Sequence, residues 1–128
     1  MKILHLVGQR EDFGGILSVI RSLHQVSPST SYQHSVWVHK EYKETREPTL
    51  NYRYGRFIIS DASSHLLIFF SSVLAFLDVR CLLRRESFDV IHAHTRGGLI
   101  VALFVSWFMR KPVLFTNHTF ARRTGFYR

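Results

Sequence analysis

The chain has 128 residues, 46% of them hydrophobic, and a formal net charge of +8 from 17 Lys and Arg against 9 Asp and Glu. This length fits one domain and excludes two full ones, and the 11 Phe among many aliphatic residues exclude a disordered chain. The positive charge favours anionic partners: nucleic acid, an acidic membrane face or phosphorylated small molecules.

The chain begins with the pattern of a strand followed by a helix. Lys2 to Val7 is a short apolar run that ends at Gly8, which is typical of a buried strand. A polar loop follows and closes with Gly14-Gly15. Apolar residues then recur at helical spacing, which predicts a helix with one apolar face made of Ile16, Val19, Ile20 and Leu23.

The next segment contains a strand and a long polar stretch. Pro28 ends the first helix, and Tyr32 to His39 is predicted to be a second strand because it contains a Val-Trp-Val run. His39 to Arg56 interleaves basic residues with tyrosines and is predicted to be a loop. A short strand at 57–59 is expected after it.

The second half alternates helices with short apolar strands. Ser63-Ser64 offers an N-cap for a helix that runs to about Arg85. Strand, helix and strand then follow at 88–93, 97–109 and 113–116. Short continuous apolar strands alternating with helices predict an α/β domain, with a Rossmann-like parallel sheet and helices on both faces.

The single cysteine and the apolar stretches bear on the compartment. One cysteine cannot build a disulfide framework, which favours the cytosol, and Cys81 is expected to be a small core residue. The first apolar run is too short for a secretory signal. Two later stretches, 66–77 and 97–109, fall short of the roughly 20 residues that span a bilayer. They are predicted to be buried helices, with membrane-surface contact as the alternative.

Polar clusters follow three of the predicted strands, at 8–15, 92–98 and 117–119. Ligands of open parallel sheets bind beyond the carboxyl ends of the strands, so this edge is the strongest functional signal. Gly14-Gly15 precedes a helix, whose free N–H groups favour phosphate or another anion. A tight turn that needs glycine is the alternative, and the spacing matches neither the dinucleotide nor the phosphate-loop motif.

Two histidines share one strand end. His92 and His94 are two residues apart, so their side chains point to the same face. With His118 they are a candidate zinc site of the kind that zinc hydrolases use. The competing interpretation makes His92 a hydrogen-bonded interior residue and puts His94 and His118 near the crevice, where a neutral imidazole can bond a sugar hydroxyl or a phosphate oxygen.

Two segments resemble the N-terminal half of family 4 retaining glycosyltransferases: MKILHLVGQREDFGGILSVIRSL and FDVIHAHTRGGLIVALFVSWFMRKPVLFTNHTF. Those enzymes have the GT-B fold, two Rossmann-like domains with the active site between them. The resemblance implies that residues 1–128 are the N-terminal, acceptor-side domain. In the complete enzyme, the implied reaction is sugar transfer from a nucleotide-sugar donor to a glycan or lipid-linked acceptor, with retained anomeric configuration.

The resemblance also assigns roles to residues at the strand ends. The glycine pair matches a loop near the donor diphosphate, His94-Thr95 matches a turn facing the cleft, and Asn117-His118 matches the strand end at the reaction centre. His118 is therefore the expected catalytic residue. The expected substrate-binding residues are Gly14, Gly15, His94, Thr95, Arg96 and Asn117. These enzymes generally need no metal, and no cofactor is expected.

The family's donor-binding domain, with its paired-glutamate E-x7-E motif, has no counterpart in this sequence, so we expect a fragment that does not transfer sugar alone. The basic tail and apolar helices favour anionic lipid, so the expected location is cytoplasmic, with peripheral contact at the inner face of the membrane. Two other classes stay open: a non-catalytic anion- or membrane-binding α/β module, and a His-based zinc hydrolase. Nucleic acid is not an expected partner, because Glu41, Glu44 and Glu47 dilute the charge of the 39–56 loop.

Overall fold

The computed structural model describes residues 1–8, 16–26, 31–42, 50–57 and 64–116. Strands and helices alternate along these ranges, as the sequence predicts. The elements are β1 (Lys2–Leu6), α1 (Ile16–Val26), β2 (Gln33–His39), β3 (Asn51–Gly55), α2 (His65–Arg85), β4 (Val90–Ala93), α3 (Arg96–Met109) and β5 (Val113–Phe115).

All strand pairs in the sheet are parallel, and the order is β3-β2-β1-β4-β5. The carboxyl ends of β1, β4 and β5 lie at the same level of the sheet. Leu6 pairs with both Trp37 and Ala93, and Ala93 pairs with Phe115. The predicted Rossmann-like parallel sheet is therefore confirmed. The ends of β1, β4 and β5 form one continuous edge, which we call the carboxyl edge.

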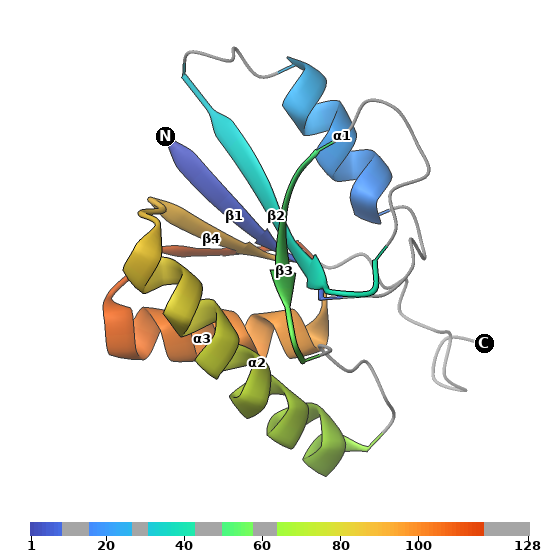
Figure 1. Ribbon diagram of the computed structural model, residues 1–128, viewed down its shortest axis with the longest axis vertical. Helices are drawn as coiled ribbons and strands as arrows, with labels where there is room; N and C mark the ends of the chain where they lie inside the picture. Colours follow the sequence, from blue (N-terminus) through green and yellow to red (C-terminus); the bar gives the residue numbers. More distant parts are fainter. Residues whose placement is uncertain (9–15, 27–30, 43–49, 58–63, 117–128) are drawn as a thin grey trace, which may run out of the picture.

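Helices cover both faces of the sheet, with α1 on one side and α2 and α3 on the other (Figure 1). Each strand divides its side chains between the two layers because successive residues point to opposite faces. Leu4 and Leu6 of β1 join the cluster with α2 and α3, whereas Val7, which directly follows β1, joins the cluster with α1.

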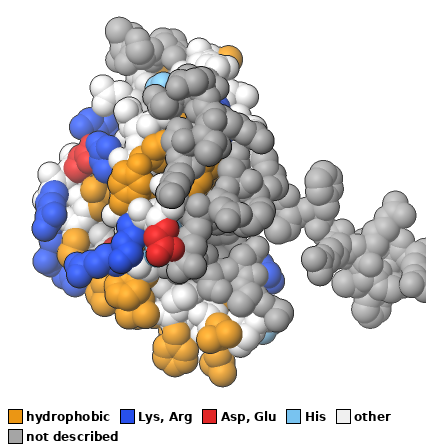
Figure 2. Space-filling view, turned by 45° about the vertical axis from the view of Figure 1, so that its right-hand side comes forward, with side chains coloured by type: hydrophobic (Ala, Val, Ile, Leu, Met, Phe, Trp, Pro, Cys, Tyr) orange, Lys and Arg blue, Asp and Glu red, His pale blue; other side chains and the backbone are white. Residues whose placement is uncertain are grey.

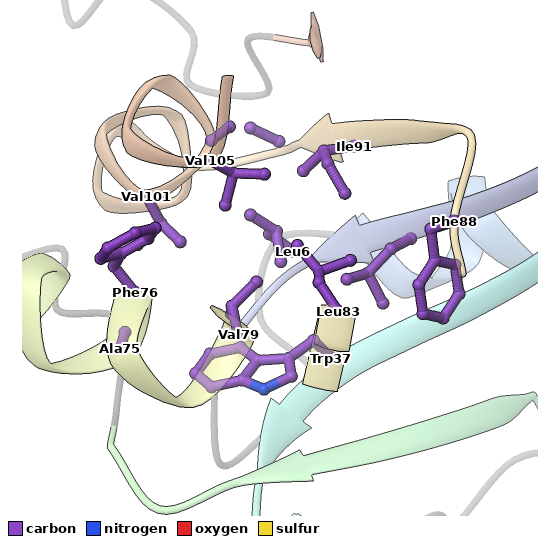
Figure 3. Packing of buried hydrophobic residues seen from close by; sticks show 13 residues of the cluster. Leu6, Trp37, Ala75, Phe76, Val79, Leu83, Phe88, Ile91, Val101 and Val105 are labelled. Carbon is purple, nitrogen blue, oxygen red and sulfur yellow. The ribbon is translucent and has the colours of Figure 1, made fainter. Parts of the chain in front are cut away.

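The layer between the sheet, α2 and α3 is a continuous hydrocarbon core. Figure 3 shows Val79 and Leu83 of α2 and Val105 of α3 converging on strand side chains that include Leu6. Trp37 is the largest side chain in this core and is 1% exposed. Its ring lies against the end of β3, where a Cβ on Gly55 would come within 1.9 Å of the indole. Glycine at that position therefore lets the indole pack flat.

The structure corrects the prediction of a loop from His39 to Arg56. Part of this segment is β3, which pairs with β2 along its whole length. β3 is an edge strand with polar and aromatic residues, and most of them are half-buried or exposed, so it lacks the apolar run by which a buried strand is recognised. The expected strand at 57–59 is not found at Phe57, which lies in a bend, and 58–59 are outside the described residues.

The predicted apolar face of α1 is also partly wrong. Leu17 and Ile20 are fully buried, but Val19 is 42% exposed. The buried face therefore runs through Ile16, Leu17 and Ile20, and it also includes Arg21. The helix is rotated slightly from the expected orientation because it must cover Val36 and Val38 of β2.

Helices α2 and α3 are not buried all round, contrary to prediction. Both leave large hydrophobic side chains in solvent, and Cys81 is exposed rather than in the core. Hydrophobic side chains protrude at the lower end of the molecule in Figure 2. At 21 residues, α2 has the length and composition of a membrane span. One face of α2 packs in the core, and 33% of its most apolar stretch is buried.

Candidate functional site

The described residues at the ends of β1, β4 and β5 border the carboxyl edge, and they include Gly8 and 92–98 of the predicted polar clusters, whereas 9–15 and 117–119 lie outside the described residues. Val7 and Gly8 follow β1, His94 and Thr95 follow β4, and Thr116 follows β5. Gly8 has a φ of 67°, a left-handed conformation that favours glycine, and its amide donates to the Trp37 carbonyl at 2.9 Å. The chain thus turns sharply as it leaves β1.

Four of the predicted site residues, Gly14, Gly15, Asn117 and His118, lie outside the described residues. Asn117 directly follows Thr116, and Gly15 directly precedes α1. Their assigned roles stay predictions. The described part of the edge carries the other three predicted residues in consecutive positions: His94 and Thr95 follow β4, and Arg96 is the first residue of α3.

Thr95 is the N-cap of α3. Its hydroxyl accepts a hydrogen bond from the Gly98 amide at 2.9 Å, and its carbonyl accepts one from the Leu99 amide at 2.8 Å. A Cβ on Gly98 would lie 3.2 Å from the Leu6 carbonyl oxygen, so the glycine lets α3 begin close against β1. The cap leaves Arg96 exposed at the first residue of α3.

Four buried histidines gather on the α1 face of the sheet, and we call them the imidazole cluster: His5, His34, His92 and His94. His5, on the central strand β1, connects two of the others. Its Nδ1 lies 2.9 Å from Nε2 of His94, and its Nε2 lies 2.9 Å from Nδ1 of His34. Neutral imidazole carries one N–H, so His5 donates to one neighbour and accepts from the other.

His92 packs beside this hydrogen-bonded row. The ring centroids of His92 and His94 are 4.0 Å apart, which confirms that the two side chains lie side by side. Nε2 of His92 is 2.8 Å from the Thr116 hydroxyl, and the residue is 6% exposed. The interpretation of His92 as a hydrogen-bonded interior residue is confirmed. His94 is equally enclosed, at 2% exposed.

Two members of the cluster, His5 and His34, have lowered pKa values, which favours their neutral forms. Burial is the main cause that lowers the pKa of His5 from 6.5 to about 2, and the neighbouring His94, His92 and His34 lower it further. Burial also lowers the pKa of His34, with a smaller contribution from His24. At neutral pH, His5 is therefore a hydrogen-bonding group and a potential metal ligand rather than a charge.

Sequence reasoning missed His5 and His34. One ligand nitrogen from each of His5, His92 and His94 can be chosen so that all three lie within 4.8 Å of one another. The structure thus places His5 beside His92 and His94, for which the sequence had predicted His118 as the third ligand. A histidine inside the apolar run of β1 was the available signal, but its meaning depends on β1 lying next to β4, with His5 opposite His92.

The parallel sheet, its helix layers and its polar carboxyl edge define a Rossmann-like α/β module. The family model described as Glycosyltransferase Family 4 matches residues 13–128, so the chain belongs to glycosyltransferase family 4 and is a glycosyltransferase N-terminal module. This confirms the family resemblance. No curated protein matches the chain.

Proposed function

We propose that the chain is the acceptor-side domain of a retaining glycosyltransferase, which moves a sugar from a nucleotide-sugar donor to a glycan or lipid-linked acceptor. Family membership supports sugar transfer in general. The observation that carries the finer proposal is the close register of β1, β4 and β5, because it brings the carboxyl ends of three strands to one edge, where parallel sheets bind their ligands.

Arg96 and the start of α3 are the proposed anion-binding elements of this edge. The helix presents a partly positive end there, and the exposed guanidinium of Arg96 adds a full charge. Both stabilise the negative charge that a departing nucleoside diphosphate or a phosphorylated acceptor carries. Because the Thr95 hydroxyl already caps α3, we propose that Thr95 supports the site mainly by fixing this helix.

The remaining proposed contacts surround this anion site. His94 lies just before it, and we propose that its ring fixes the shape of the crevice floor, since its Nε2 bonds His5. His118 stays the proposed catalytic residue, with Gly14, Gly15 and Asn117 as further substrate contacts. These four assignments rest on the family resemblance alone.

A binding experiment with the whole chain tests the anion site. Affinities are measured for a panel of UDP-, GDP- and ADP-linked sugars and phosphorylated sugars, for the wild type and Arg96→Ala. A charge-assisted hydrogen bond contributes about 1.5–3 kcal/mol, so Arg96→Ala is expected to weaken the best ligand by roughly 10-fold or more. Arg80→Ala removes another exposed arginine, on α2, and is the matched control. If Arg96→Ala and Arg80→Ala bind the best ligand with equal affinity, the assignment of Arg96 is contradicted. It is also contradicted if the wild type binds no compound of the panel.

We propose further that α2 and α3 dock the domain on an anionic membrane. An apolar ridge of exposed side chains supports this: Leu66, Leu67, Phe70, Leu74, Leu77, Leu103, Trp107 and Phe108. Exposed arginines lie at the ends of the same helices, at positions 80, 84, 85 and 110. Exposed apolar groups beside basic residues are the composition that binds the interface of anionic bilayers.

Tryptophan fluorescence tests the docking proposal. Trp107 is 83% exposed whereas Trp37 is 1% exposed, so a change of emission on adding vesicles reports on Trp107. We expect a blue shift with vesicles of phosphatidylcholine and phosphatidylglycerol, and a much smaller one with phosphatidylcholine alone. For the double variant Arg84→Glu/Arg85→Glu, we expect the blue shift to be equally small with both kinds of vesicle. An emission spectrum that neither vesicle changes contradicts the proposal.

A further inference from the structure

We propose that His5, His92 and His94 bind a late first-row divalent metal ion such as zinc. Three buried imidazoles come together within the protein interior, with a set of ligand nitrogens that lie within 4.8 Å of one another. Imidazole nitrogen is a preferred ligand for zinc, copper and nickel. This inference is independent of the sugar-transfer proposal, because it depends only on the geometry of the imidazole cluster.

The spacing of the nitrogens suits a tetrahedral ion. Zinc–nitrogen bonds of about 2.0 Å at tetrahedral angles place ligand nitrogens about 3.3 Å apart. His5 Nδ1 and His94 Nε2 are 2.9 Å apart, and one nitrogen from each of the three rings lies within 4.8 Å of the others, so small side-chain movements reach this spacing. The three rings come from β1 and from the end of β4, which pair directly, so a rigid scaffold carries them.

Two hydrogen bonds orient the proposed ligands from outside. His5 Nε2 bonds Nδ1 of His34, and His92 Nε2 bonds the hydroxyl of Thr116. If each ligand ring donates its N–H to that partner, its other nitrogen, Nδ1, keeps a lone pair for the ion. Partners of this kind fix ring orientation and tautomer in metal sites, and their loss typically weakens metal binding 10- to 100-fold.

Metal binding replaces the hydrogen bond between His5 and His94. With its N–H on Nε2, His5 accepts at Nδ1 from Nε2–H of His94. Coordination requires lone pairs on both of these nitrogens, so the hydrogen of His94 moves to its Nδ1. All three rings remain neutral, and the protein releases no net proton. Because none of the three ligands is a carboxylate, an anion taken up from solution, such as chloride, would balance part of the charge without release of a proton.

Cobalt(II) is the probe for this site, because tetrahedral cobalt absorbs visible light strongly and reports its ligands. The purified chain, stripped with a chelator, is titrated with Co²⁺ and then with Zn²⁺. We expect one equivalent of Co²⁺ with tetrahedral absorption, displaced by one equivalent of Zn²⁺. His92→Asn and His94→Asn should abolish the band, whereas His65→Asn, an exposed histidine on α2, should leave it unchanged.

A variant of a residue next to the ligands distinguishes a preformed metal site from nonspecific binding by histidines. His34→Asn leaves all three ligands in place and should weaken cobalt binding by roughly 10- to 100-fold. Circular dichroism of each metal-free variant shows whether it folds. If a ligand variant does not fold, the wild-type titration still decides. Failure of the wild type to take up one tetrahedral Co²⁺ overturns the proposal, as does equal binding by the His65→Asn and ligand variants in their folded forms.

Discussion

The two faces of one sheet differ in chemistry although they come from the same strands. The face toward α2 and α3 is filled by aliphatic and aromatic side chains around Trp37. The opposite face has a smaller apolar cluster under α1 and, beside it, the imidazole cluster. In β4, Ile91 and Ala93 face the first layer, while His92 lies on the other face.

This contrast separates stability from chemistry. Burying one large aliphatic or aromatic side chain contributes about 1.5–3 kcal/mol, so the α2/α3 face accounts for most of the stabilisation. Buried imidazoles cost free energy unless their nitrogens are hydrogen-bonded, as the 2.9 Å bonds of His5 show them to be. The buried imidazoles of His5, His34 and His94 therefore satisfy one another by hydrogen bonding.

The largest expected effect comes from the α2/α3 face. Trp37→Ala should lower the free energy of unfolding by about 3–5 kcal/mol, because it removes the largest buried side chain and leaves a cavity. Trp107→Ala is the matched control: the same atoms are removed from an exposed position, and the change should stay within about 0.5 kcal/mol. Urea unfolding measures both. If both variants lowered the free energy of unfolding by similar amounts, Trp37 would not be a core residue.

The imidazole cluster should make the free energy of unfolding depend on pH. The folded chain holds His5 neutral down to about pH 2, whereas the unfolded chain protonates it near 6.5. Between these values the unfolded state binds the extra proton. The free energy of unfolding therefore falls as the pH drops below about 6.5, by about 1.4 kcal/mol per pH unit from this group.

Comparing variants isolates this contribution. In urea unfolding between pH 7.5 and 5, His5→Asn should have a shallower pH dependence than the wild type by about that amount per unit. Leu17→Ala lies on the same face and should be destabilised by about 2–5 kcal/mol, yet keep the wild-type slope. Parallel curves for the wild type and His5→Asn would show that His5 is not held neutral.

A smaller effect is expected at the carboxyl edge. Thr95→Ala should cost about 1 kcal/mol, because the Gly98 amide loses its capping hydroxyl. Ser64 is the N-cap of α2, but its side chain makes no capping hydrogen bond, so Ser64→Ala should have almost no effect. Thermal unfolding compares the two caps, and a larger loss for Ser64→Ala would contradict the geometry.

The smallest expected effect is at the periphery of the α2/α3 face. Arg53 on β3 makes two hydrogen bonds of 2.7 Å to Glu86, which follows α2, and these lower the pKa of Glu86. Both side chains remain partly exposed, so Glu86→Gln should cost at most about 1 kcal/mol at neutral pH. The difference from the wild type should shrink as the pH falls through 4.5, and a difference that grows on acidification would contradict the ion pair.

The fold was largely predictable because its signals are local. Apolar runs identified β1, β2, β4 and β5, helical spacing identified α1, and long apolar stretches identified α2 and α3. β3 was not predicted because an edge strand needs no apolar run. Cys81 was wrongly assigned to the core because the sequence pattern of a helix does not show how much of it the neighbouring elements cover.

The site was predictable only in part because its residues are joined across strands. His92 and His94 share one strand end, and their proximity follows from strand geometry alone. His5 and His34 reach them only through the order β2-β1-β4 and its register, which a single sequence does not reveal. The exposed side chains of α2 and α3 were expected only as the alternative to buried helices, because the sequence does not show how much of each helix its neighbours cover.

The central claim is that the carboxyl edge, and not the opposite edge or the α2/α3 face, is where this glycosyltransferase module meets its ligand. Amide NMR maps this directly: the tightest ligand of the sugar-phosphate panel is titrated into the labelled chain, and shifted amides are located. We predict that the shifts centre on Gly8, His94 to Arg96 and Thr116, with Gln33 and Asp89 at the opposite edge unchanged. Shifts centred on Gln33 and Asp89, or confined to the apolar ridge, would contradict the account.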